Sequence, residues 1–179
     1  MPRGTSPPGP KGLAASVKER ELLRTALARH LPEVPAGVPG GNAPALLPIL
    51  HHVQDALGFV PPALVPEIAA ALNLSRAEVH GVVTYYHHFR GAPPGRHVVQ
   101  VCQAEACRAN GAERLMAHAA ARLACAPHAT RADGAVTLEP VYCLGLCASG
   151  PAAMVDGQLR GRVSAAAVDA WAARFEAAP

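Results

Sequence analysis

The sequence of 179 residues is poor in the features that mark membrane-bound, secreted and nucleic-acid-binding proteins. It contains no apolar run as long as the roughly 18 residues that a membrane-spanning helix requires. Its first residues, MPRGTSPPGPKGLAAS, lack the apolar stretch of a secretory signal peptide. We therefore expect a cytoplasmic protein without membrane insertion, in a compartment where cysteine thiols stay reduced.

Basic and acidic residues are nearly balanced, which argues against a nucleic-acid partner. The chain has 16 lysine and arginine residues against 13 aspartate and glutamate residues, and neither half forms a basic patch. Common enzyme motifs are also absent, because there is no G-x-G-x-x-G after a strand, no P-loop and no Ser–His–Asp signature. The chain therefore offers no evident catalytic site of its own, and any hydride or substrate chemistry would belong to a partner.

Four of the five cysteines form two close pairs. Cys102 and Cys107 enclose four residues, and Cys143 and Cys147 enclose three. In a reducing compartment, such pairs predict metal ligands before they predict disulfides. Four thiolates can hold a [2Fe–2S] cluster or a zinc ion. Spacing alone favours the cluster and leaves zinc, a disulfide or free thiols open.

Proline and glycine divide the chain into parts. Residues 1–15 are expected to form a disordered tail. Residues 16–90 are predicted to form a helical domain, interrupted by a proline- and glycine-rich linker at 32–43. A second stretch of proline and glycine at 90–95 predicts a boundary, beyond which residues 96–179 form another domain.

Helix signals are strong in the first of these domains. Ser16 with Glu19, and Ser75 with Glu78, have the spacing of capping boxes at helix starts. Apolar residues between 44 and 89 recur at helical spacing and predict three short helices that pack together.

Two kinds of side chain are expected to be buried. The aromatic residues Tyr85, Tyr86 and Phe89 are expected to pack in the core or between the domains. The unpaired Cys125 is expected to act as a small buried hydrophobic residue.

The second domain changes to alternating strands and helices. Strands are predicted at 97–101 and 136–142, each running into a cysteine pair, with a helix at 111–124 between them. The dipeptide Asp156-Gly157 predicts a hairpin turn between two further strands. The order β-α-β-β-α predicts a small thioredoxin-like α/β domain, so the whole chain is of α+β class. In such a sheet, sites form at strand ends.

The residues around the cysteines suit a cluster. Cys107 stands just before the predicted helix at 111–124, whose N-terminal dipole would favour negative charge on sulfur. In the second loop, Gly145 permits the left-handed backbone that a tight turn needs.

Several segments resemble a known family. VCQAEACRANGA at 101–112 and EPVYCLGLCASGPAAMV at 139–155 look like the thioredoxin-like [2Fe–2S] subunit of NADH dehydrogenase modules. ALLPILHHVQDALGFVPP and LNLSRAEVHGVVTYYHHF resemble that family's N-terminal helical domain. The resemblance covers about residues 44–163 and matches all four ligand positions. It implies one [2Fe–2S] cluster held by Cys102, Cys107, Cys143 and Cys147.

Three relatives share this module: the small iron–sulfur subunit of respiratory complex I, the diaphorase subunit of NAD-reducing hydrogenases, and the gamma subunit of molybdenum-containing NAD-dependent formate dehydrogenases. The complex I and hydrogenase versions more often read G-T-A-C before the second cysteine. This chain reads Ala104-Glu105-Ala106-Cys107 and carries TYYHHF at 84–89, which most resemble the formate dehydrogenase subunit.

The resemblance implies an electron-transfer subunit of a complex that converts formate and NAD⁺ to CO₂ and NADH. FMN and NAD would bind in a larger neighbouring subunit, and the molybdenum cofactor in a third, iron–sulfur-containing subunit. The helical domain would be a docking surface. The alternatives are the equivalent subunit of complex I or of a hydrogenase and, from the cysteines alone, a zinc-stabilised interaction module.

Overall fold

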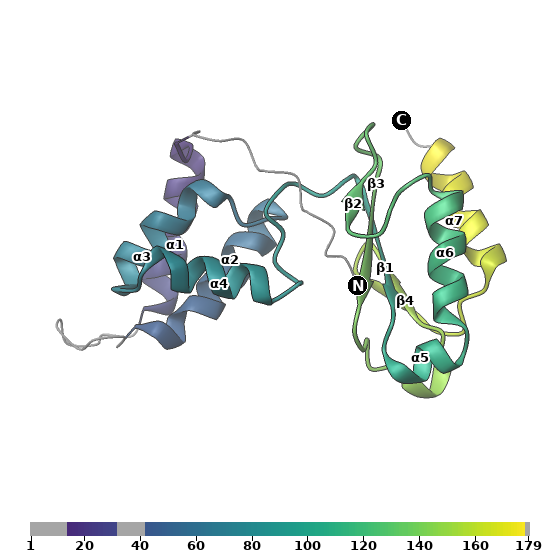
Figure 1. The fold of residues 1–179 in the computed structure, drawn as a ribbon. Helices are drawn as coiled ribbons and strands as arrows, with labels where there is room; N and C mark the ends of the chain where they lie inside the picture. The colour runs from purple at the N-terminus through teal and green to yellow at the C-terminus, as the bar shows by residue number, and fades with distance from the viewer. Residues whose placement is uncertain (1–13, 32–41, 178–179) are drawn as a thin grey trace. The chain divides into compact units, whose positions relative to one another are not determined.

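The computed structural model describes residues 14–31 and 42–177. It comprises two compact units, which divide between Pro93 and Pro94. The helices and strands of both units are labelled in Figure 1.

Two expectations fall wholly or largely outside the described residues, namely the tail at 1–15 and the linker at 32–43. Among the helices that are described, none is both long and apolar enough to cross a membrane.

The first unit is helical. Its elements are α1 (Val17–His30), the 3-10 turn η1 (Ala43–Ala45), α2 (Leu46–Leu57), the 3-10 turn η2 (Pro62–Leu64), α3 (Val65–Leu72) and α4 (Arg76–Tyr85). Both predicted capping boxes are confirmed, because the Oγ atoms of Ser16 and Ser75 each accept a hydrogen bond from the third residue of the helix at 3.2 Å. Helix α2 ends at Gly58, whose φ of 83° is a left-handed conformation that glycine adopts readily.

The apolar faces of these helices enclose one core. Its fully buried members include Ile49, Leu50, Leu64, Ile68 and Leu72. Of the three aromatic residues expected in the core or between the domains, Phe89 is buried in this core. Tyr85 and Tyr86 are 75% and 43% exposed and do not belong to it.

A buried polar side chain fixes the segment that follows α4. The Gln54 Nε2 donates a hydrogen bond to the carbonyl of His88 at 2.7 Å, and the Gln54 Oε1 accepts one from the Arg90 N–H at 2.8 Å. Because both polar ends of Gln54 have partners, its burial in α2 carries little desolvation penalty.

The second unit is a mixed sheet with helices. Its elements are β1 (His97–Cys102), α5 (Glu105–Ala109), α6 (Ala112–Arg122), β2 (Ala129–Thr130), β3 (Val136–Val141), the 3-10 turn η3 (Cys147–Ser149), β4 (Ala153–Val155), β5 (Gln158–Arg160) and α7 (Ala165–Ala177). The strand order is β2-β3-β1-β4-β5, with β1 and β3 parallel and the other neighbours antiparallel. Asp156 and Gly157, with φ of 49° and 78°, form the predicted hairpin turn. The predicted α+β class is confirmed.

Helices α6 and α7 lie side by side against the sheet (Figure 1). Leu115 and Ala119 of α6 and Phe175 of α7 belong to one buried cluster with Val99 of β1 and Leu138 of β3. Cys125, just after α6, belongs to the same cluster and is buried as predicted. This core fixes β1 and β3, the two strands that lead into the cysteine pairs.

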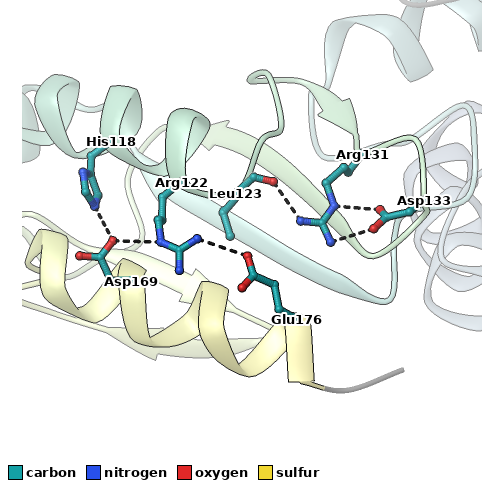
Figure 2. Close-up of polar contacts among 7 residues, drawn as sticks. All are labelled: His118, Arg122, Leu123, Arg131, Asp133, Asp169 and Glu176. Carbon is teal, nitrogen blue, oxygen red and sulfur yellow. Dashed lines mark hydrogen bonds and ion pairs between the residues drawn. The ribbon is translucent and has the colours of Figure 1, made fainter.

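A hydrogen bond and two ion pairs join α6 to α7 at the surface (Figure 2). The His118 Nε2 lies 2.9 Å from the Asp169 Oδ1, and Arg122 lies 3.6 Å from Asp169 and 3.2 Å from Glu176. All four side chains are partly exposed, and pairs of this kind contribute about 1 kcal/mol or less. The apolar cluster beneath therefore dominates the packing of the two helices.

A second set of contacts closes the turn before β3 (Figure 2). Arg131 donates a hydrogen bond to the carbonyl of Leu123 at 3.2 Å and pairs with Asp133 at 2.8 Å. The hydrogen bond from Arg131, assisted by the Ala135 N–H, lowers the pKa of Asp133 to about 2.

Two short elements are absent from the sequence predictions. Helix α5 has five residues and β2 has two, so neither is long enough to show a hydrophobic period. The predicted strand at 136–142 ends one residue early, because Tyr142 lies outside β3.

Two leucines on α2 provide a matched test of the helical core. Leu50 is fully buried, whereas Leu47 is 36% exposed on the same helix. We expect Leu50→Ala to lower the free energy of unfolding of the helical unit by about 2–5 kcal/mol, because it leaves a cavity. Leu47→Ala is expected to cost less than about 1 kcal/mol. Urea denaturation followed by circular dichroism measures both, and equal losses would contradict this account of the core.

Candidate metal centre

The first cysteine pair spans the end of β1 and the short helix after it. Cys102 is the last residue of β1, and Cys107 lies inside α5 rather than in a loop. Both are almost completely buried, with 2% of their surface exposed. Cys107 packs against Ala112, the first residue of α6, so the expected contribution of that helix's dipole stays a prediction.

Backbone N–H groups surround the sulfur of Cys102. Burial alone would raise the pKa of this thiol, but N–H groups of Ala104, Cys143 and Leu144 and the thiol of Cys107 donate toward it. Their combined effect holds the pKa of Cys102 below its ordinary value. The backbone around Cys102 therefore stabilises negative charge on its sulfur.

The pKa values of one further cysteine in each pair are raised. Burial raises the pKa of Cys107, although the N–H of Ala152 opposes the shift. The pKa of Cys147 is raised chiefly by its hydrogen bond with Cys143, followed by the charge of that neighbour. The paired cysteine contributes to both shifts, as a smaller cause at Cys107 and as the main cause at Cys147.

The second pair lies in the turn that follows β3. Cys143 has a left-handed backbone with φ of 73°, and Gly145 follows with φ of 79°. The Sγ atoms of Cys143 and Cys147 lie 3.7 Å apart, and both residues are exposed. Gly145 has the conformation expected of it, whereas the left-handed conformation of Cys143 has no sequence signal, because non-glycine residues seldom adopt it.

Pairing of β1 with β3 brings the two cysteine loops together. In the parallel register Cys102 stands opposite Val141, so both strands end at the same edge of the sheet. The Gln103 N–H then donates to the Val141 carbonyl at 2.7 Å, and the Cys102 N–H donates to the Ala152 carbonyl at 2.9 Å. These bonds join the end of β1 to the residues that precede and follow the second cysteine pair.

Small and apolar residues fill the space between the loops. Cys102 and Cys107 form a buried cluster with Ala112 and Ala152, against which Leu144 and Leu146 pack. Gly150 also approaches closely, since a Cβ atom placed there would lie 3.4 Å from the Cys107 Cα. A larger residue at either alanine would displace one of the cysteines.

The donor set fits a cluster of two metal atoms. Four thiols lie in two pairs along the chain, and a [2Fe–2S] cluster takes two protein ligands for each iron. The donor set and the N–H groups aimed at Cys102 suit that group.

Comparison with protein families gives one match to most of the chain. Residues 33–176 match the family of thioredoxin-like [2Fe–2S] ferredoxins. A subunit of the NADH-quinone oxidoreductase of Pseudomonas aeruginosa is 36% identical over 119 residues, which cover 66% of this chain and 72% of that protein. The corresponding protein of Escherichia coli is 33% identical over 132 residues, covering 74% of this chain and 80% of that protein.

A solved structure gives a similar fold. A chain of an NAD⁺-reducing [NiFe]-hydrogenase in the H₂-reduced state superposes with a TM-score of 0.64 and 28% sequence identity. The match covers 77% of this chain but only 23% of the hydrogenase chain. From the match over residues 33–176, the chain belongs to the thioredoxin-like [2Fe–2S] ferredoxin family, which implies one [2Fe–2S] cluster.

Proposed function

We propose that the chain is an electron-transfer subunit whose cluster is held by Cys102, Cys107, Cys143 and Cys147. The observation that carries this proposal is the convergence of two cysteine loops at one edge of the sheet, where β1 and β3 end together. When bound, a [2Fe–2S] cluster supplies one-electron storage and no bond chemistry. A lone site of this kind serves as a relay between partners.

The residues of the chain have distinct tasks in this proposal. The N–H groups of Ala104 and Leu144 stabilise negative charge on the Cys102 sulfur. Leu144 and Leu146 pack against the buried cysteine pair and restrict the access of water to it. Hydrogen bonding and burial of this kind set the reduction potential of such a site.

The relatives point to a partner that binds flavin and NAD. They are subunits of NADH-quinone oxidoreductases and a chain of an NAD⁺-reducing hydrogenase. By analogy, this chain would lie beside a larger subunit that holds FMN and NAD. We place the assembly in the cytoplasm, where thiol ligands stay reduced.

Within this class, we favour the gamma subunit of a molybdenum-containing, NAD-dependent formate dehydrogenase. The support is in the sequence, at Ala104-Glu105-Ala106-Cys107 and TYYHHF at 84–89. A molybdenum-containing iron–sulfur subunit would then be a second partner. The equivalent subunit of complex I or of an NAD-reducing hydrogenase is the alternative that the relatives support.

Replacement of single cysteines tests the ligand set. We expect Cys143→Ser to weaken retention of iron by at least about tenfold, because it removes a thiolate ligand, and to abolish or change the EPR spectrum of the reduced protein. Cys125→Ser is the matched control, since Cys125 is packed in the sheet core and its Sγ lies 3.2 Å from the Ala129 carbonyl. It should keep the full EPR signal. An unchanged spectrum in Cys143→Ser would remove that residue from the ligands.

The parent complex is tested by purification from the native organism through a tag on this chain. We expect co-purification of a molybdenum-containing subunit together with formate-dependent reduction of NAD⁺, because the relay would connect those two reactions. Co-purification of hydrogenase or quinone-reducing subunits would contradict the formate assignment and leave the cluster proposal intact.

A further inference from the structure

Gln103 follows the first cysteine of the candidate metal centre and makes three hydrogen bonds there. Its backbone N–H donates to the Val141 carbonyl at 2.7 Å, a bond that any residue except proline could make. Its side-chain Nε2 donates to the carbonyls of Cys102 at 3.2 Å and of Ala112 at 3.1 Å. The side-chain amide therefore connects the end of β1 to the first residue of α6.

The Cys102 carbonyl lies where strand pairing would ordinarily supply its donor. Strands β1 and β4 are antiparallel with Val101 opposite Ala153, so the next pair in this register is Cys102 with Ala152. The Cys102 N–H donates to the Ala152 carbonyl at 2.9 Å. In a hydrogen-bonded antiparallel pair, the Ala152 N–H would return a bond to the Cys102 carbonyl.

The Ala152 N–H has a different acceptor in this structure. It donates to the sulfur of Cys107, a residue with only 2% of its surface exposed. Because that N–H points to the sulfur, the Cys102 carbonyl receives its donor from the Gln103 Nε2. A buried carbonyl left without a donor would carry a free-energy penalty. The side-chain bond to the carbonyl and the backbone bond to the sulfur are therefore linked.

The length and chemistry of glutamine both matter at this position. Two carbonyl acceptors require a donor, which an ionised glutamate lacks and which methionine lacks at similar length. Asparagine has the donor but is one methylene shorter. The contact with Ala112 also depends on this reach, because it joins β1 to a different element.

We propose that Gln103 is a positioning residue of the metal centre, whose side-chain amide leaves the Ala152 N–H to the Cys107 sulfur and so raises the reduction potential of the bound cluster. The inference rests on the proposed function and adds to it a residue that is not a ligand but sets the potential. An N–H bonded to a ligand sulfur favours the reduced state, because it stabilises the added negative charge. Without the amide, the Cys102 carbonyl would compete for that N–H and weaken this effect.

The test is the reduction potential of the full chain with its cluster, measured by redox titration followed by EPR. Gln103→Met keeps the length of the side chain and removes the amide. We expect it to lower the equilibrium constant for reduction by about three- to tenfold, the range of one hydrogen bond. A tenfold decrease corresponds to about 59 mV for one electron.

Gln158→Met is the matched control, because Gln158 is an exposed glutamine of β5 whose Oε1 accepts a hydrogen bond from Arg160 at 2.6 Å. It should leave the potential unchanged. An unchanged or raised potential in Gln103→Met with a retained EPR signal would overturn the proposal. An equal decrease in both variants would also overturn it.

A crystal structure of the unmodified chain with its cluster decides the question if Gln103→Met loses the cluster. The Gln103 Nε2 should lie within hydrogen-bond distance of the Cys102 carbonyl, and the Ala152 N–H should point to the Cys107 sulfur. A Gln103 side chain turned away, or an Ala152 N–H bonded to the carbonyl, would overturn the proposal. Absence of any cluster signal in the unmodified chain would instead contradict the proposed function.

Discussion

The candidate metal centre depends on the parallel pairing of β1 with β3. Its register places Cys102 opposite Val141. Both strands therefore end at the same edge of the sheet, and the segments that carry the cysteine pairs begin there. This pairing brings together cysteine pairs that are far apart in the sequence. A shift of β3 by one residue would turn its side chains to the opposite face and move Cys143 away from Cys102. The hydrophobic core that α6 and α7 form with the strands therefore holds the site in position.

Burial divides the site into two unequal halves. The Cys102–Cys107 half is enclosed by Ala112, Ala152 and two leucines, and it receives most of the backbone N–H groups directed at sulfur. The Cys143–Cys147 half is open and adjoins the exposed ring of Tyr142. In the proposed function, the first half would protect and tune the bound group, and the second would stay accessible to a partner. A relay needs both properties, because it must retain its cofactor and still lie close to the next redox group.

Much of this organisation could be predicted from the sequence. Ser16 and Ser75 mark helix starts with a local signal, and the strand leading into each cysteine pair shows the expected apolar residues. The exposure of Tyr85 and Tyr142 could not be predicted, because an aromatic residue carries the same sequence signal in a core and at an interface. Helix α5 and strand β2 are too short for a periodic pattern, and the left-handed Cys143 is imposed by the tertiary structure. The sequence could not predict that the N–H groups of Ala104 and Ala152 are directed at sulfur, because every residue except proline has such a group.

The central claim is that this chain holds one [2Fe–2S] cluster, and the metal and sulfide content of the purified protein tests it most directly. The account predicts close to two iron atoms and two acid-labile sulfides per chain, with zinc at trace level. A colourless protein with one zinc ion per chain and no labile sulfide would contradict it, and would make the two cysteine loops a structural zinc site.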